Sequence, residues 1–334
     1  MKKRTAIFRC DGGPNIGNGH ILRELILAEH LKKKNIRIIF LIKQCSLFLK
    51  NLVKSNFRII TLKKDSFKEI KKKIYGLNCY YFIIDHYNFS FSLEKKISAL
   101  AKKIIVIEDF PKKKHIANLI IDQNLNRKKK DYVNLKKNNS KLLIGPKYTL
   151  IDTKLRKISI NKNKNKISNI LMCFGGFDGH KLNLRILKYL QKIERKFKIN
   201  VLLNRDDNYY KQVLDFFKKN KISGRVCNNR TLLKVIKNVD FAIISGGIIA
   251  KEIIASQIPC MIISTSKDQF KNCIEYNKLS RVKYIGKWHT LKKNFFIYHF
   301  RKVLDLEESL LNKKNKRIFD FNGPTRISNE ILKL

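Results

Sequence analysis

A glycine-rich turn near the amino terminus carries a histidine at the point where a helix is predicted to begin. The turn follows the apolar run Thr5–Cys10, opens with Asp11 and ends in Gly17-Asn18-Gly19-His20, with Arg23 three residues further on. Glycines in such a turn let backbone N–H groups approach an anionic or sugar ligand closely. An imidazole can take a proton from water near neutral pH. The segment therefore predicts an enzyme that acts on a phosphorylated small molecule.

Four further segments follow predicted strands and carry polar or glycine residues. They are Asp85-His86-Tyr87, Glu108-Asp109, Gly175-Gly176-Phe177-Asp178 and Ser245-Gly246-Gly247. Glycine pairs at strand ends allow close approach to phosphate, and the helix predicted after Gly247 adds its dipole. Glu252 lies one turn into that helix, where its carboxylate can accept hydrogen bonds from two ribose hydroxyls. These features indicate a nucleotide ligand.

The elements that must position these residues alternate between apolar runs and amphipathic stretches, which predicts α/β architecture with parallel sheets. The expected strands are Thr5–Cys10, Arg37–Ile42, Arg58–Thr61, Tyr80–Asp85, Ile104–Glu108, Leu119–Asp122, Ile167–Phe174, Asn200–Leu203, Gly224–Val226, Phe241–Ser245 and Cys260–Ile263. The expected helices include Ile21–Lys33, Leu93–Lys102, Lys181–Lys196, Tyr209–Asn220, Thr231–Asn238, Ile248–Ser256 and Gln269–Leu279. In open α/β sheets, ligands bind at the carboxyl ends of the strands. We therefore expect two Rossmann-like domains facing a cleft.

Length and composition support this organisation. The 334 residues suit two domains, and the polar stretch Ser159–Lys166 is the predicted linker between domains 1–158 and 167–334. No apolar run is long enough to span a membrane. The seven cysteines are scattered without C-x-x-C spacing, which is typical of reduced thiols in a cytoplasmic protein. The remaining histidines lack metal-ligand spacing, so no metal site is predicted.

The formal net charge of +47 raises the question of a nucleic-acid partner. The densest basic runs are Arg127–Lys130 and Lys112–Lys114. Lysine is nevertheless spread over nearly every predicted helix and loop, and no aromatic-studded basic stripe or nucleic-acid-binding motif accompanies it. We therefore expect no specific nucleic-acid partner.

The chain resembles the UDP-2,4-diacetamido-2,4,6-trideoxy-β-L-altropyranose hydrolases of pseudaminic acid biosynthesis. Proteins described as spore-coat polysaccharide biosynthesis proteins are equally similar. The resemblance covers almost the whole chain. The segments that carry it are the G-x-G-H-x-x-R run Gly17–Arg23, Asp85-His86-Tyr87, Gly145–Ile151, Gly175–Asp178, Ser245-Gly246-Gly247 with Glu252, Asp268-Gln269 with Asn272, and Asn322–Ile327.

The resemblance implies a GT-B fold and an inverting hydrolysis in which His20, as general base, activates the water that attacks the anomeric carbon. It further implies that the second domain holds UDP, with no metal or cofactor, and that the protein is a monomer. The motifs and the resemblance together predict these substrate-binding residues: Asp11, Gly17, Asn18, Gly19, Arg23, Asp85, Tyr87, Gly175, Gly176, Asp178, Gly246, Gly247, Ile248, Glu252, Gln269 and Asn272. Two departures affect the exact substrate. Ile248 and Ile249 stand where the family usually has Ser or Thr, and Phe177 stands where a small or hydroxyl residue is frequent.

Several alternatives stay open at this point. His20 could cap the helix instead of acting as a base. Asp11 could orient His20 or the water, or only complete its strand through an Asx-type turn. His86 and its neighbours could contact substrate or form a buried strand-end network. An inverting UDP-sugar glycosyltransferase would use the same scaffold and base with a sugar hydroxyl in place of water. A non-catalytic protein that binds polyanions or nucleic acid is the remaining alternative.

Overall fold

The computed structural model describes residues 3–13, 16–157, 165–204, 208–227, 232–313 and 317–334. The predicted linker Ser159–Lys166 lies mostly outside these residues. The chain divides into two compact units, unit 1 with residues 1–151 and 321–334, and unit 2 with residues 152–320. In the described part of the chain, every helix is too short or too polar to span a bilayer.

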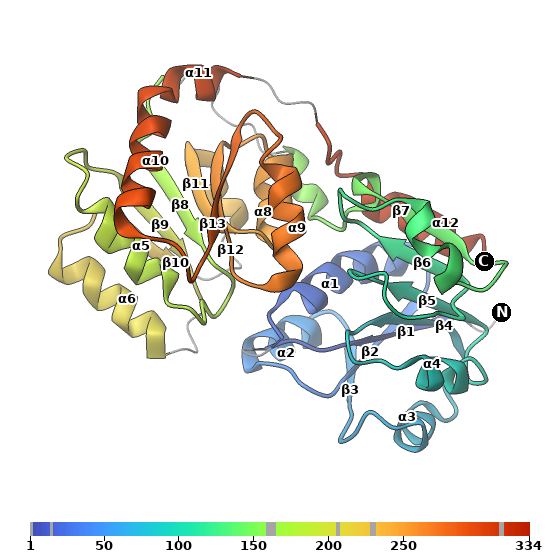
Figure 1. Cartoon of the computed structure of the whole chain (residues 1–334). Coiled ribbons are helices and arrows are strands. Elements are labelled where there is room, and N and C mark those ends of the chain that lie inside the picture. The colour runs from blue at the N-terminus through green and yellow to red at the C-terminus, as the bar shows by residue number, and fades with distance from the viewer. Residues whose placement is uncertain (1–2, 14–15, 158–164, 205–207, 228–231, 314–316) are drawn as a thin grey trace. The chain divides into compact units, whose positions relative to one another are not determined.

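Unit 1 contains a seven-stranded parallel sheet with the order β3-β2-β1-β4-β5-β6-β7 (Figure 1). Its strands are β1 (Thr5–Cys10), β2 (Arg37–Ile42), β3 (Arg58–Thr61), β4 (Cys79–Asp85), β5 (Lys103–Ile107), β6 (Leu119–Asp122) and β7 (Lys141–Ile144). Its helices are α1 (Gly19–Lys32), α2 (Leu47–Lys54), α3 (Phe67–Ile74), α4 (Phe91–Ile97) and α12 (Gly323–Leu332).

Both faces of this sheet are covered, which explains why β1 is buried along its whole length. Ala6 and Phe8 belong to a core that includes residues of α1, α2 and α12. Ile7 points to the opposite face, in a second core with Ile70 of α3 and Ile97 of α4. This alternation follows from the two-residue period of a strand.

Unit 2 contains a six-stranded parallel sheet with the order β10-β9-β8-β11-β12-β13. Its strands are β8 (Asn169–Cys173), β9 (Lys198–Leu202), β10 (Gly224–Cys227), β11 (Phe241–Ser245), β12 (Cys260–Ser264) and β13 (Val282–Lys287). Its helices are α5 (Leu182–Leu190), α6 (Asn208–Lys219), α7 (Leu232–Val235), α8 (Ile248–Ala255), α9 (Lys267–Tyr276), α10 (Lys293–Asp305) and α11 (Glu307–Asn312). Short 3₁₀ segments occur in unit 1 at Lys129–Leu135 and Pro146–Tyr148, and in unit 2 at Thr153–Lys157 and Ile236–Asn238. The predicted pair of Rossmann-like α/β sheets is thus confirmed.

The last helix belongs to unit 1, although it follows unit 2 in the sequence. Ile327 and Ile331 of α12 are fully buried in the same core as α1. Gly323 begins α12 against the backbone of Thr149, whose oxygen would lie 2.1 Å from an added Cβ atom. The division of the chain therefore differs from the predicted ranges, since residues 321–334 pack with the first domain.

Candidate active site

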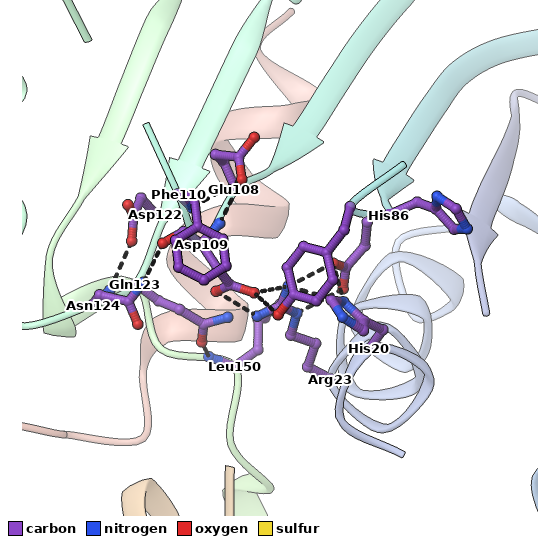
Figure 2. A network of polar contacts seen from close by, with 12 residues as sticks. His20, Arg23, His86, Glu108, Asp109, Phe110, Asp122, Gln123, Asn124 and Leu150 are labelled. Atoms are coloured by element: carbon purple, nitrogen blue, oxygen red, sulfur yellow. Dashed lines mark hydrogen bonds and ion pairs between the residues drawn. The ribbon is translucent and has the colours of Figure 1, made fainter. Parts of the chain in front are cut away.

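His20, which Figure 2 shows beside Arg23, meets Asp85 at the carboxyl edge of the unit 1 sheet. His20 is the second residue of α1, and Asp85 is the last residue of β4, which lies beside β1. The His20 Nδ1 atom is 2.6 Å from Asp85 Oδ1, and both side chains are buried. We take Nδ1–H as the donor to the carboxylate, at 2.6 Å in preference to the longer 3.2 Å approach of Arg23 Nη2 to the same nitrogen, and in this tautomer Nε2 keeps its lone pair. His20 is therefore oriented as a base through Nε2.

Arg23 joins Asp85 to a second carboxylate, Asp109. Its guanidinium donates to Asp85 Oδ2 and Oδ1 at 2.6 and 2.5 Å, and to Asp109 Oδ1 and Oδ2 at 2.9 and 2.8 Å. Burial alone would raise the pKa of both acids, but Arg23 outweighs it, lowering the pKa of Asp109 to about 2 and that of Asp85 well below its usual range. Both carboxylates are thus ionised at neutral pH.

Tyr87 forms the exposed wall of this cluster. Its ring meets the His20 ring edge-on, with centroids 4.6 Å apart, and its hydroxyl donates to Asp109 Oδ2 at 3.3 Å. The residue is 43% exposed, whereas His20 is 6% exposed. Tyr87 is therefore the member of the cluster most open to a ligand.

Asp11 and His86 form a separate cluster with Arg9. The Asp11 carboxylate accepts hydrogen bonds from Arg9 and from the backbone N–H groups of Lys43 and Gln44, and His86 Nε2 lies 3.1 Å from it. Figure 2 shows the His86 ring turned away from His20. The residue that orients His20 is thus Asp85, and the contacts of Asp11 tie β1 to the loop after β2.

The glycine-rich turn itself is closed by its own backbone. Gly13 and Gly17 exchange two hydrogen bonds, at 3.1 and 2.7 Å, and Gly17 has a φ of 83° that favours glycine. Gly19 then begins α1. Asn18 is buried at the helix start, and no hydrogen-bond partner reaches either polar atom of its side chain within the described structure. A buried amide of this kind is unusual, and it supports a ligand contact at the turn.

Two groups of acidic and histidine side chains are close enough to suggest a cation site, Asp11-Asp65-His86 and His20-Asp85-Asp109. In each group an arginine already bonds the carboxylates, Arg9 in the first and Arg23 in the second. A metal ion would have to displace a buried guanidinium. The carboxylates of both groups are therefore already paired with a cation of the protein itself.

In unit 2, the loop after β8 has a structural carboxylate. Asp178 accepts the backbone N–H groups of Leu182 and Asn183 at 2.9 and 2.7 Å, at the start of α5. Burial raises the pKa of Asp178 to about 6 despite these bonds. Gly175 precedes it with a φ of 91°, and the Gly176 carbonyl accepts from the backbone of Asn204. Asp178 thus holds α5, and its predicted contact with substrate stays a prediction.

The loops after β11 and β12 are joined by Gln269. Its Oε1 atom accepts from the Gly246 N–H at 3.1 Å and from the backbone and hydroxyl of Thr265 at 3.0 Å each. Gly247 precedes α8, and no side chain caps the helix start at Ile248. The first N–H groups of α8 are therefore available to an anion. Asn272 lies on α9, three residues after Gln269.

Glu252 lies on α8, and the pKa of its carboxyl group is raised. Burial, with a further contribution from Asp152, raises its pKa to about 8. Protonated at neutral pH, this carboxyl can donate as well as accept a hydrogen bond. Titratable groups with strongly shifted pKa values are common at functional sites.

We predict that Gly246→Ala lowers the free energy of unfolding by about 1–3 kcal/mol, because the new methyl group overpacks the loop. An added Cβ atom would lie 2.2 Å from Cys273 Sγ. Urea denaturation would measure the effect, and adding Cys273→Ala should recover part of it. Gly247→Ala is the matched control, because its nearest neighbour would be 3.6 Å away. Equal losses for the two alanine variants would contradict the packing argument.

Comparison with known proteins gives two relatives. No protein-family model matches the chain. An uncharacterized protein of Methanocaldococcus jannaschii is 28% identical over 299 residues, which are 86% of this chain and 60% of that protein. The chain thus spans less than two thirds of the length of the archaeal relative. The UDP-2,4-diacetamido-2,4,6-trideoxy-beta-L-altropyranose hydrolase of Campylobacter jejuni is 25% identical over 246 residues, covering 74% of this chain and 86% of the relative.

Solved structures define the fold class. MurG of Acinetobacter baumannii superposes with a TM-score of 0.68 at 12% identity, covering 99% of this chain and 100% of that chain. The calicheamicin glycosyltransferase CalG4 gives a TM-score of 0.65 at 10% identity, covering 100% and 98%. The chain therefore has the GT-B fold of two Rossmann-like domains.

Proposed function

We propose that the protein hydrolyses a UDP-linked sugar at its anomeric C–O bond. The observation that carries this proposal is the bond from His20 Nδ1 to Asp85, which leaves Nε2 free to accept a proton. The similarity to the Campylobacter hydrolase supports the reaction and suggests a diacetamido-trideoxy sugar. The free sugar would then be available for nonulosonic acid synthesis.

In this mechanism His20 Nε2 takes a proton from water as the water oxygen bonds to the anomeric carbon. The bond from that carbon to the UDP oxygen breaks, its electron pair leaves with UDP, and the configuration inverts. Asp85 stabilises the imidazolium that forms, and Arg23 keeps Asp85 ionised. Tyr87 and Asn18 are assigned to the sugar.

We assign UDP to unit 2. The diphosphate would meet the N–H groups around Gly247 and the start of α8, which stabilise the leaving group. Gln269 already accepts the Gly246 N–H, so its role is to shape the loop. Glu252 would bind the ribose hydroxyls. Ile248 offers no hydroxyl at the phosphate, so backbone N–H groups must supply the contacts there.

The test is UDP release from UDP-2,4-diacetamido-2,4,6-trideoxy-β-L-altropyranose, without acceptor and with EDTA present. Steady, stoichiometric release of UDP and free sugar is the expected result. A protein that binds UDP but releases none would contradict hydrolysis of this sugar.

The second candidate function is an inverting UDP-sugar glycosyltransferase, which the likeness to CalG4 favours. His20 would then deprotonate a sugar hydroxyl. The same assay separates the two, because a transferase releases UDP rapidly only when its acceptor is added. A non-catalytic protein would release none under either condition.

The raised pKa of Glu252 predicts proton release on nucleotide binding. Hydrogen bonds from two ribose hydroxyls stabilise the ionised form of a carboxyl group, whereas free Glu252, with a pKa of about 8, is mostly protonated at pH 7. UDP binding at pH 7 should therefore release up to about one proton from this group. Calorimetry in two buffers of different ionisation enthalpy would count it. The Glu252→Gln variant reports the protons that UDP itself loses, and this number is subtracted from the wild-type value. If both proteins release the same number of protons, Glu252 does not belong to the ribose site.

A further inference from the structure

A fully buried carboxyl group lies beside the His20–Asp85 pair. Glu24 is on α1, four residues after His20, so the two side chains lie on one side of the helix. It is 0% exposed, and within the described residues no donor reaches either of its carboxyl oxygens. Folded proteins seldom bury an acid in this way.

The groups around Glu24 cannot neutralise its negative charge. The groups that interact electrostatically with Glu24 are Asp85 on β4, Cys10 on β1 and the cation Arg23 on its own helix. The Arg23 guanidinium is already bonded to Asp85 and Asp109. Burial, with the Asp85 carboxylate next, raises the pKa of Glu24 well above its usual range.

Two adjacent carboxyl groups in a buried site do not both ionise unless a cation bridges them, as Arg23 bridges Asp85 and Asp109, because the charges repel in a low dielectric. Asp85 receives hydrogen bonds from Arg23 and His20, and Glu24 receives none. The negative charge therefore resides on Asp85, and the proton resides on Glu24.

We propose that Glu24 keeps its proton at neutral pH and donates a hydrogen bond to the Asp85 carboxylate, acting as a positioning residue for the His20–Asp85 pair. In the resting state Arg23, Asp85 and Asp109 then carry one net negative charge together, and an ionised Glu24 would add a second. The added charge would hold a proton more tightly on His20 after each turnover. A neutral Glu24 thus holds the Asp85 side chain in position and still allows His20 to release its proton after turnover.

Infrared spectroscopy tests the protonation directly. The difference spectrum of wild type and Glu24→Gln at pH 7 should contain the carbonyl band of a protonated carboxyl group, present only in the wild type. The subtraction cancels other buried acids such as Glu252. A difference spectrum that instead shows loss of a carboxylate band would overturn the proposal.

Stability gives a second test that does not depend on any activity. Glu24 is neutral in the fold, but ionises in the unfolded chain above about pH 4. A raised folded pKa means stability that is complete below that pH and declines as pH rises toward the folded pKa. The folding equilibrium of the wild type, relative to Glu24→Gln, should therefore fall by up to about tenfold per pH unit. A ratio that does not change with pH would contradict a neutral Glu24.

The catalytic consequence rests on the proposed function. Glutamine can donate a hydrogen bond to Asp85, whereas leucine cannot. We expect Glu24→Leu to lower kcat for UDP release by about tenfold or more with little change in KM, and Glu24→Gln to retain most of the rate. Equal rates for both variants would overturn the positioning role. If the wild type releases no UDP, the proposed hydrolysis fails, while the infrared and stability results still decide the state of Glu24.

Discussion

Replacing His20 with glutamine should lower kcat for UDP release by about 10²–10⁴-fold while leaving the affinity for UDP nearly unchanged. Glutamine fills a similar volume and can still donate to Asp85, so the variant should keep its fold. It has no group that accepts a proton near neutral pH. Single-turnover kinetics and UDP titration would separate the effects on rate and affinity.

The matched control for this variant is His86→Gln. His86 lies on the same sheet edge, but it contacts Asp11 and is turned away from His20. Its replacement should change kcat far less. A loss of under tenfold for His20→Gln would remove His20 as the general base, whatever the control shows.

Arg23→Met should lower the free energy of unfolding by about 3–5 kcal/mol, because it leaves Asp85 and Asp109 buried without their cation. The arginine is 4% exposed and makes four hydrogen bonds of 2.9 Å or less to these acids. Chemical denaturation followed by a probe in unit 1 would measure the loss. The effect should shrink as pH falls. Without Arg23, burial raises the pKa of both acids, so the variant regains stability as pH falls toward about 4. Below about pH 4 the wild type loses the stability that its lowered pKa values provide.

A lysine in the same unit provides the control for Arg23. Lys43 pairs with Asp65 at 3.3 Å and its side chain is 43% exposed. A surface pair of this kind contributes about 0–1 kcal/mol, so Lys43→Met should change stability little. Similar losses for the two variants would show that the Arg23 cluster is not the stabilising feature described above.

The sheets were predictable because their interior strands are continuous apolar runs bounded by polar turns. The strands that the sequence did not reveal, β7 and β13, lie at sheet edges. Edge strands bury less surface, and Val282–Lys287 is further interrupted by Lys283 and Gly286. Edge position alone does not decide the outcome, because the edge strands β3 and β10 were predicted; the apolar pattern of β13 is interrupted, and the run of β7 is only four residues long.

Helix ends were less predictable than helix positions. The helix expected at Leu93–Lys102 is observed as α4 (Phe91–Ile97). It begins earlier because the Ser90 hydroxyl accepts the Leu93 N–H, a capping signal that apolar spacing does not report. The helix expected at Lys181–Lys196 likewise ends at Leu190. In both cases the amphipathic spacing continues past the end of the helix, so the predicted helices extend too far.

The candidate site was predictable as a set of strand ends, but its pairings were not. His20 and Asp85 are 65 residues apart, and only the strand order β1-β4 brings them together. Asp109 was recognised at a strand end without a role, and it proves to be the second partner of Arg23. Glu24 was not selected, although an acid four residues after His20 on a predicted apolar face was an available signal.

The position of α12 has a consequence for how the protein is made. Residues 321–334 complete the core around α1, yet the ribosome synthesises them after all of unit 2. Unit 2 is continuous in sequence and can fold as soon as it emerges. Unit 1, most of which is translated first, instead keeps part of its apolar surface exposed until α12 is synthesised. Co-translational folding should therefore finish in reverse order, and a stalled chain lacking α12 would be a natural substrate for chaperones.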